Sequence, residues 1–288
     1  MKPYAALLAS ALVAALPLAA QTPVDPKSPI PGYPDGRGPK GPVAIKFVSP
    51  AADEVIPMPA AVEGQPAPKG ARVEVKVAVE NFEVWKDEAS GRGQHVQLVF
   101  DGRPLADWYL IDKPWVFPAV PPGTHTLLAF VQRPWDESIR EAGAFAAVTF
   151  HVGEKNGKPA FDAAQPAITA TSPRGKVKKA DAAKLLFDFF VSGCKVGPAT
   201  DPEACQVAYR LDQEPQKVLS AWEPVLWENV AVGKHSFAAA LLKGDKRVET
   251  PFAVTQGFFE VVEDPAPAAP AGAAPAAPAA PAAPAAPA

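Results

Sequence analysis

The sequence has few of the residue types on which metal, redox and nucleophilic sites depend. Only 2 Cys and 4 His occur among its 288 residues. No Cys-x-x-Cys, His-Glu-x-x-His or EF-hand spacing is present, and neither is a Gly-x-Ser-x-Gly or phosphate-loop motif. We therefore expect no catalytic residues, no metal and no cofactor. An enzyme with an unrecognised site stays as an alternative.

A strong charge of either sign is also missing. The 28 Lys and Arg against 31 Asp and Glu leave a net charge of −3 at pH 7, which offers little attraction to nucleic acid or to an anionic membrane. After residue 20 no apolar run is long enough to span a bilayer. No segment shows a sustained 3.6-residue apolar period. These absences argue against a nucleic-acid-binding protein, a membrane span and a helical fold.

The first twenty residues are typical of a secretory signal peptide. Lys2 supplies a positive charge, residues 5–16 are apolar except for Ser10, and small residues precede Gln21. An apolar stretch of this length is too short for a membrane-spanning helix. We therefore expect an exported protein of the periplasm, the cell envelope or the extracellular space.

Two parts of the chain repeat one pattern. A segment that ends in Asp occurs at 96–101 (VQLVFD) and at 207–212 (VAYRLD), and a Gly-x-His segment occurs around His125 and His235. The separation is 111 residues for the first pair and 110 for the second, so the register holds to within one residue. Solenoid repeats are roughly 20 to 50 residues long, so a repeat of this size indicates a duplicated domain.

Proline and glycine mark the parts of the chain outside the two copies. Residues 21–42 have Pro or Gly at almost every second position, and the end of the chain repeats Pro-Ala-Ala without the regular Gly of collagen. Each copy contains its own strands, so we expect each to fold independently. The expected organisation is signal peptide 1–20, Pro/Gly-rich leader 21–42, first domain 43–153, linker 154–166, second domain 167–263 and Ala/Pro-rich tail 264–288.

Alternating apolar and polar residues predict β-strands in both copies. Four valines at alternate positions share one face of segment 72–82, and segment 185–191 repeats this alternation. Seven or so short strands in about 110 residues are typical of an antiparallel β-sandwich. The fold class we predict is all-β, with two tandem antiparallel β-sandwich (immunoglobulin-like) domains and disordered Pro-rich ends. Further strands of the first copy are expected at 43–48, 95–100, 108–111, 115–117, 124–131 and 145–152.

Three features recur at corresponding places in the two copies. A first strand ends in Ser-Pro at 49–50 and at 172–173, a late strand begins with Gly-x-His, and an apolar strand closes each copy. With these features the chain resembles the tandem immunoglobulin-like or fibronectin type III-like modules of exported bacterial proteins. The resemblance covers both copies and implies a fold, but no activity.

Two of the four histidines occupy equivalent positions. His125 and His235 each follow a turn Gly by two residues and share strand parity with the core-facing residues. This place at the rim of a sandwich predicts a structural role, in which a ring nitrogen bonds the backbone or a nearby side chain; a ligand site is the alternative. His95 and His151 lie at other places, so we expect no convergence of histidines on a metal.

The two cysteines flank one loop. Cys194 and Cys205 lie between two predicted strands, close enough in sequence for their Cα atoms to come within bridging distance. In an exported chain this spacing predicts a structural disulfide rather than a redox pair. The first copy has Glu83 and Gln94 at the corresponding places, so the fold does not require the bond.

Aromatic residues of the first copy are the best candidates for a binding surface. Trp85, Trp108, Tyr109 and Trp135 lie near predicted loops, and the three tryptophans have no aromatic counterpart in the second copy. Exposed flat rings can stack on sugars, peptides or partner proteins. Burial in the core is the alternative for each of them.

A charged segment around residues 133–141 has a simpler interpretation. It contains Asp136, Glu137 and Glu141 together with Arg133 and Arg140, and we expect a solvated surface there.

These features predict an exported, non-catalytic binding or spacer module of the periplasm or cell envelope, which engages another protein or an envelope polymer. A carbohydrate- or peptide-binding module that uses the Trp-rich face of the first copy is an alternative.

Overall fold

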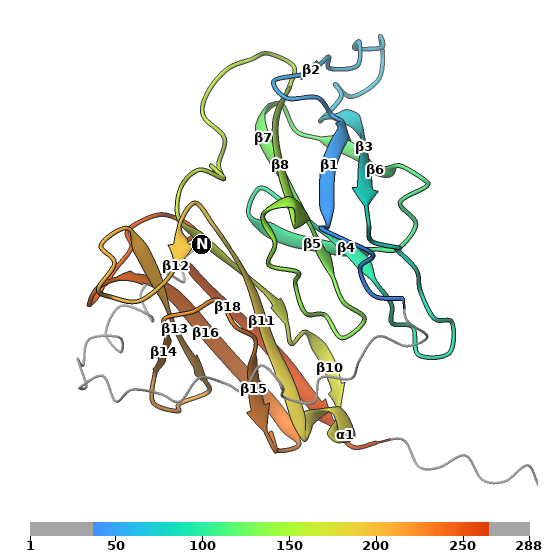
Figure 1. The fold of residues 1–288 in the computed structure, drawn as a ribbon. Helices are drawn as coiled ribbons and strands as arrows, with labels where there is room; N and C mark the ends of the chain where they lie inside the picture. Colours follow the sequence, from blue (N-terminus) through green and yellow to red (C-terminus); the bar gives the residue numbers. More distant parts are fainter. Residues whose placement is uncertain (1–36, 265–288) are drawn as a thin grey trace, which may run out of the picture.

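The structure, a computed structural model, describes residues 37–264 of the chain. The predicted signal peptide, most of the predicted leader and the Ala/Pro-rich tail from residue 265 lie outside the described residues. Within the described range the chain forms two bodies whose regular secondary structure is almost wholly β-strand, one from each copy of the repeat (Figure 1).

The first copy, which we call the first sandwich, contains two sheets. One has three strands in the order β1-β3-β6, and the other has five in the order β2-β8-β7-β4-β5. The elements are β1 (Ala44–Ser49), β2 (Val55–Ile56), β3 (Ala71–Glu80), β4 (His95–Phe100), β5 (Arg103–Trp108), β6 (Trp115–Val120), β7 (Gly123–Gln132), a short 3-10 helix (Ala142–Ala144) and β8 (Phe145–Val152).

The second copy, the second sandwich, also contains two sheets. One has three strands in the order β15-β11-β9; the other has seven, with the path β10-β18-β16-β13-β12, where β14 pairs with β13 and β17 with β16. The elements are β9 (Ala167–Ser172), β10 (Gly175–Lys178), α1 (Lys179–Ala182), β11 (Lys184–Ser192), β12 (Lys195–Val196), β13 (Ala204–Leu211), β14 (Lys217–Leu219), β15 (Val225–Glu228), β16 (Gly233–Lys243), β17 (Lys246–Arg247) and β18 (Val254–Val262).

The two copies share one arrangement of strands. The sheet β1-β3-β6 corresponds to β9-β11-β15, and β8-β7-β4-β5 corresponds to β18-β16-β13-β14. A short parallel strand is repeated as well, because β2 runs beside β8 as β10 runs beside β18. The predicted fold class, two tandem and mainly antiparallel β-sandwiches, is confirmed.

One strand lies earlier than the alternation predicted. A strand was expected over 108–111, whereas β5 ends at Trp108. The reason is the turn at Asp101 and Gly102, whose φ angles of 47° and 76° return the chain directly so that Arg103 pairs with Phe100. A two-residue turn with positive φ at both positions matches the twist of a hairpin.

Each sandwich has its own core between its two sheets. In the first sandwich Val75 of β3 and Leu98 of β4 are fully buried in this core, as the alternation predicted for their strands. In the second sandwich Phe187 of β11 stacks on Trp227 of β15, with ring centroids 4.8 Å apart. Short-range alternation therefore locates the inner faces of both sandwiches.

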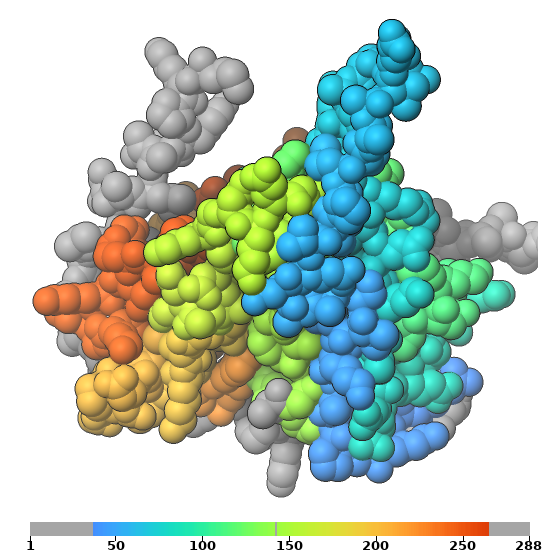
Figure 2. Space-filling view, turned by 90° about the horizontal axis from the view of Figure 1, so that it is seen from above, coloured from blue at the N-terminus to red at the C-terminus, as the bar shows by residue number. Residues whose placement is uncertain are grey.

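A third apolar cluster joins the two sandwiches. Phe190 of β11 stacks on Phe130 of β7 and Phe145 of β8, with ring centroids 4.5 and 4.8 Å apart. Phe161, in the segment predicted as a linker, is 1% exposed and belongs to the same cluster. In the space-filling view the two halves are in contact and the yellow-green connecting segment lies between them (Figure 2). The connection between the sandwiches is thus partly buried.

Candidate functional site

The two equivalent histidines make the same contacts in both sandwiches. In the first, His125 Nδ1 donates to Asp101 Oδ2 at 2.8 Å, and Nε2 donates to the Pro121 carbonyl at 2.9 Å. In the second, His235 Nδ1 donates to Asp212 Oδ2 at 2.7 Å, and Nε2 donates to the Ala231 carbonyl at 2.8 Å. We call each of these arrangements an Asp–His clasp.

The aspartate of each clasp also holds the neighbouring strand. Asp101 Oδ1 accepts the backbone N–H of Thr126 at 2.9 Å, and Asp212 Oδ1 accepts that of Ser236 at 2.7 Å. Each Asp has a positive φ, 47° and 48°, a conformation that Asp tolerates better than most residues. The clasp therefore ties the turn after β4 or β13 to the start of β7 or β16.

Both clasps favour the protonated ring. Burial lowers the pKa of His125, but its hydrogen bonds to Asp101 and Pro121 raise it, and the net pKa lies above the ordinary value of 6.5. The pKa of His235 is raised in the same way, against the effect of burial. Because carboxylate and carbonyl oxygens only accept hydrogen bonds, both contacts form only when both ring nitrogens carry a proton. The structural role of the two histidines stays a prediction, which their pH dependence can test.

The cysteine pair and its counterpart close the same loop by different means. Cys194 and Cys205 form a disulfide, with Cα atoms 6.2 Å apart. At the corresponding places of the first sandwich, the buried side-chain amide of Gln94 donates to the carbonyl of Glu83 at 2.5 Å. A covalent bond in one copy thus corresponds to a side-chain hydrogen bond in the other.

The four candidate aromatic residues lie in two environments. Trp108 is 3% exposed and belongs to the core of the first sandwich. Its proposed place on a binding surface is therefore corrected: β5 pairs Trp108 with Val96, whose side chain faces the core, and the ring points the same way. Trp85, Tyr109 and Trp135 are only partly buried.

These three aromatic residues lie at one end of the first sandwich, around His95. The N–H of Trp85 bonds the carbonyl of the residue before His95 at 2.9 Å. Tyr109 follows β5, and its ring centroid is 5.0 Å from that of His95. Trp135 lies in the loop after β7, whose last residue pairs with His95. We call Trp85, Tyr109 and Trp135 the aromatic rim.

A charged side chain accompanies each member of the rim. The guanidinium of Arg37 lies 5.0 Å from the ring centroid of Trp85, and the ammonium of Lys86 lies 5.0 Å from that of Tyr109. The indole N–H of Trp135 donates to the Glu137 carboxylate at 2.7 Å. Cations at this distance from an aromatic ring are attracted by its negative face, so these charges help to order the rim.

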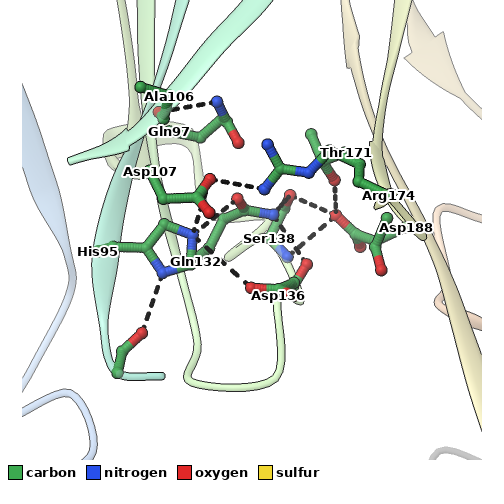
Figure 3. A network of polar contacts seen from close by, with 12 residues as sticks. His95, Gln97, Ala106, Asp107, Gln132, Asp136, Ser138, Thr171, Arg174 and Asp188 are labelled. Carbon is green, nitrogen blue, oxygen red and sulfur yellow. Dashed lines mark hydrogen bonds and ion pairs between the residues drawn. The ribbon is translucent and has the colours of Figure 1, made fainter. Parts of the chain in front are cut away.

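Behind the rim, His95 lies in a network of polar contacts (Figure 3). The ring is fully buried; Nδ1 faces the Gly93 carbonyl at 2.9 Å and Nε2 faces Gln132 Oε1 at 3.1 Å. The carboxylates of Asp107 and Asp136 lie 3.8 and 3.9 Å from Nε2. Oxygen atoms from β5, β7 and the loop after β7 therefore surround one imidazole.

The network changes the acidity of two neighbours. Burial raises the pKa of Asp136; the nearby His95 lowers it and Asp107 raises it further. Burial, with Asp107 and Asp136, also raises the pKa of Tyr109 to about 12. The Tyr109 hydroxyl therefore stays protonated even in strongly alkaline solution and can donate a hydrogen bond.

The network continues into the second sandwich. Arg174 bonds Asp107 at 2.6 Å, and the fully buried Asp188 of β11 receives donors from both sandwiches. Its carboxylate accepts the N–H of Ser138 at 3.2 Å, the Ser138 hydroxyl at 2.5 Å, the Thr171 hydroxyl at 2.8 Å and the Arg140 guanidinium at 2.5 Å. Burial raises the pKa of Asp188, while Arg140 and the two hydroxyls oppose this rise.

The charged segment 133–141 is thus not the solvated surface that its composition predicted. Glu137 is 9% exposed and Ser138 is fully buried. Their surroundings explain the difference, because Arg133 and Arg140 both bond Glu137, and Arg140 also bonds Asp188. Charged side chains that form ion pairs and hydrogen bonds with one another can be buried away from water.

Asp188 was missed in the sequence although a signal was present. It interrupts LLFDFFV (185–191), a run that is apolar on both faces of its strand. A run of this kind indicates a strand buried on both sides, and a buried carboxylate needs donors. Leu127–Val131 (LLAFV) carries the same signal for the opposing strand β7.

Two further observations concern the described part of the chain. Within residues 37–264 no group of three or more His, Cys, Asp or Glu side chains is placed to hold a metal ion. Over the same residues no helix has the length and apolar character needed to cross a membrane.

His151 makes contacts of its own, with the Thr124 hydroxyl at 2.9 Å and Asp53 at 3.3 Å, separate from those of the other histidines.

Comparisons with known proteins found similarity to solved structures alone. No family model and no curated protein matches the sequence. Among solved structures, the fibronectin(III)-like modules of Clostridium thermocellum CbhA are 13% identical, with 76% of this chain and 94% of that chain covered and a TM-score of 0.26. A putative membrane anchored protein from Corynebacterium diphtheriae is 12% identical, with 79% and 60% covered and a TM-score of 0.25.

A Bacteroides ovatus protein, SGBP-B of a mixed-linkage glucan utilization locus, was solved in complex with a mixed-linkage heptasaccharide. It is 13% identical, with 77% of this chain and 47% of that chain covered and a TM-score of 0.21. At these TM-scores the likeness to the solved structures carries no argument about this chain. The strand order and the contacts between the two copies define a tandem β-sandwich protein with an interdomain polar network.

Proposed function

We propose that this chain is an exported, non-catalytic binding module of the periplasm or cell envelope, and that it engages another protein through the aromatic rim. The rim supports this proposal because it gathers three partly exposed aromatic side chains beside two cations. Trp, Tyr and Arg are enriched among the residues that contribute most to the affinity of protein interfaces.

Preorganisation of the rim adds support. Tyr109 rests against the buried ring of His95, and the Trp135 indole is bonded to Glu137. Side chains that are already ordered lose less conformational entropy when a partner binds. Such a surface suits recognition of a folded partner.

Export is proposed on two grounds. Residues 1–20 have the pattern of a signal peptide, and Cys194–Cys205 forms a disulfide, a bond that persists in oxidising compartments. The Ala/Pro-rich tail 264–288 would act as a spacer, since Pro-rich segments serve as semi-rigid linkers.

The proposal can be tested by comparing three proteins as bait for a native envelope extract. Wild-type chain should capture a specific protein, the triple variant Trp85→Ala, Tyr109→Ala, Trp135→Ala should lose it, and the control Phe258→Ala should retain it. Phe258 is a suitable control because it is 75% exposed on the second sandwich, on β18. Capture that survives in the folded triple variant would refute the role of the rim.

The alternatives are separated by two further assays. Binding of purified wild-type chain to soluble polysaccharides or peptides, lost in the triple variant, would indicate a carbohydrate- or peptide-binding module instead. Turnover in a broad hydrolase screen would indicate an enzyme.

A further inference from the structure

The loop that carries Trp135 is held from the opposite sandwich. Residues 133–140 connect β7 to the short 3-10 helix of the first sandwich. Ser138 in this loop gives its backbone N–H and its hydroxyl to Asp188, and Arg140 gives its guanidinium to the same carboxylate. One buried side chain of the second sandwich thus accepts three hydrogen bonds from the loop.

The contacts continue without a gap from Asp188 to the rim. The Arg140 guanidinium that bonds Asp188 also donates to Glu137 Oε1 at 3.3 Å, and Glu137 Oε2 accepts the Trp135 indole N–H at 2.7 Å. Glu137 Oε1 is further held by Arg133 at 3.0 Å. A continuous set of hydrogen bonds therefore links the Trp135 ring to a carboxylate in the other sandwich.

Apolar packing by itself does not provide this order. The stacked rings of Phe130, Phe145 and Phe190 bring the sandwiches together, but contact between apolar surfaces is non-directional. Hydrogen bonds to a charged group are strong and directional, and buried polar groups can select one arrangement among several of similar packing. The Asp188 contacts are of this kind.

We propose that Asp188 is a positioning residue: docking of the second sandwich sets the conformation of loop 133–140 and so completes the aromatic rim of the first. This proposal goes further than the proposed function and rests on it only in treating the rim as the binding surface. Docking and binding are then coupled, because a partner that needs Trp135 in its observed place recognises the docked pair of sandwiches.

The buried carboxylate of Asp188 has no counterpart in the first copy. By strand register the residue equivalent to Asp188 in the first sandwich is Lys76 of β3, which is exposed. The buried carboxylate is therefore not required by the sandwich fold, which both copies share, and its burial belongs to the contact between the copies.

The test measures the Trp135 indole in the full chain, without any ligand. The indole N–H signals of uniformly 15N-labelled protein are recorded for wild type and for Asp188→Asn, with Trp135→Phe used to assign the signal. We expect the Trp135 signal to shift in Asp188→Asn and its hydrogen exchange to accelerate at least about tenfold, as expected from loss of a charge-assisted hydrogen bond network. The Trp115 signal should stay in place.

The matched control is Asp181→Asn. Asp181 forms an ion pair with Arg92 at 3.1 Å, also between the two sandwiches but without a contact to loop 133–140. This variant should leave the Trp135 signal unchanged. A Trp135 shift in both variants would show that loss of any polar contact between the sandwiches moves the loop, and that result would overturn the proposal.

Two milder variants cover the case in which Asp188→Asn does not fold. Thr171→Val removes one donor to Asp188 from the second sandwich, and Arg140→Lys keeps the charge but not the two-sided guanidinium contact. The proposal requires a Trp135 shift and faster exchange in both. An unchanged Trp135 signal in these folded variants would overturn it, whereas loss of partner capture in the rim variant would bear only on the proposed function.

Discussion

The two sandwiches share one plan of strands but use different outer faces. In β3 of the first sandwich the outward residues Lys76 and Ala78 reach solvent, whereas the equivalent Asp188 and Phe190 of β11 are buried. The first sandwich meets its neighbour instead with the outer face of β7 and β8. Contact between two different faces is heterologous, so a duplicated fold does not produce a symmetric pair.

This difference shows which parts of a duplicated domain are constrained in common. The inner faces alternate in the same way because each sandwich needs a core between its sheets. The outer faces diverge because only contact between the copies determines whether they are wet or buried.

Separation of the two sandwiches should have the largest effect. Fragments obtained by cutting between Gly153 and Pro166 should both fold, since each retains its own core. The first fragment should unfold at lower urea concentration than in the intact chain and should self-associate, because Phe130 and Leu128 lose their cover. Urea unfolding and sedimentation velocity measure this. A fragment without dispersed amide signals would contradict the duplicated-domain interpretation.

A single ring at the interface should have the next largest effect. Phe190→Ala should lower the free energy of unfolding by about 3–5 kcal/mol, because it leaves a cavity against Phe130 and Phe145. The matched substitution Ala78→Ser at the equivalent outward place of β3 should change it by less than about 0.5 kcal/mol. Equal effects in urea titrations would show that the two outer faces are not distinct.

The two ways of closing the equivalent loops should differ in strength. Replacing both Cys194 and Cys205 with Ser should lower the stability of the second sandwich by about 2–3 kcal/mol, in proportion to the small loop that the disulfide closes. Gln94→Ala should lower that of the first sandwich by about 1 kcal/mol for its hydrogen bond to Glu83. Thermal unfolding of both variants gives the comparison. Two free thiols in denatured, non-reduced protein would contradict the disulfide.

The Asp–His clasps should behave alike in the two sandwiches. His125→Asn and His235→Asn should each lower the free energy of unfolding by about 1–3 kcal/mol, because each ring makes the same two bonds and its side chain is 10% or 12% exposed. Urea titration of each variant near pH 6 measures the effect. Loss of partner capture by a stable variant would instead make the histidines a binding site.

The pH dependence of stability should be a smaller effect of the same contacts. Because the pKa of His125 and of His235 is raised on folding, their contribution is fully present below the unfolded value of 6.5 and is lost as the pH rises through the folded pKa values. Unfolding free energies measured from pH 5.5 to 8.5 should therefore fall with rising pH. The double variant His125→Asn, His235→Asn should have a flatter profile; an unchanged slope would contradict the ionised clasp.

Most of the architecture could be read from local patterns. Alternation along β3 and β11 identified the inner faces, and the repeated Asp and Gly-x-His segments identified two copies of one fold. The spacing of Cys194 and Cys205 pointed to the disulfide. These features are local because strand period, turn conformation and short loop closure depend on residues close together in the chain.

The environment of single side chains in the candidate site was harder to predict. Trp108 was placed on a surface but is buried, because the turn at Asp101 shifted the start and end of β5. Phe161 lies in the segment predicted as a linker, where its ring fills the contact between the sandwiches. In both cases the aromatic side chain is compatible with a surface location and with a buried one.

The sequence by itself determined two β-sandwiches, their inner cores and the disulfide of the second sandwich, since each follows from periodicity or spacing within one copy. Only the tertiary structure decided which outer faces meet, and with them the burial of Asp188 and the bonding of the loop that carries Trp135. The physical reason is distance along the chain. Ser138 and Asp188 are 50 residues apart, and their contact exists only in one relative orientation of two bodies that no local pattern specifies.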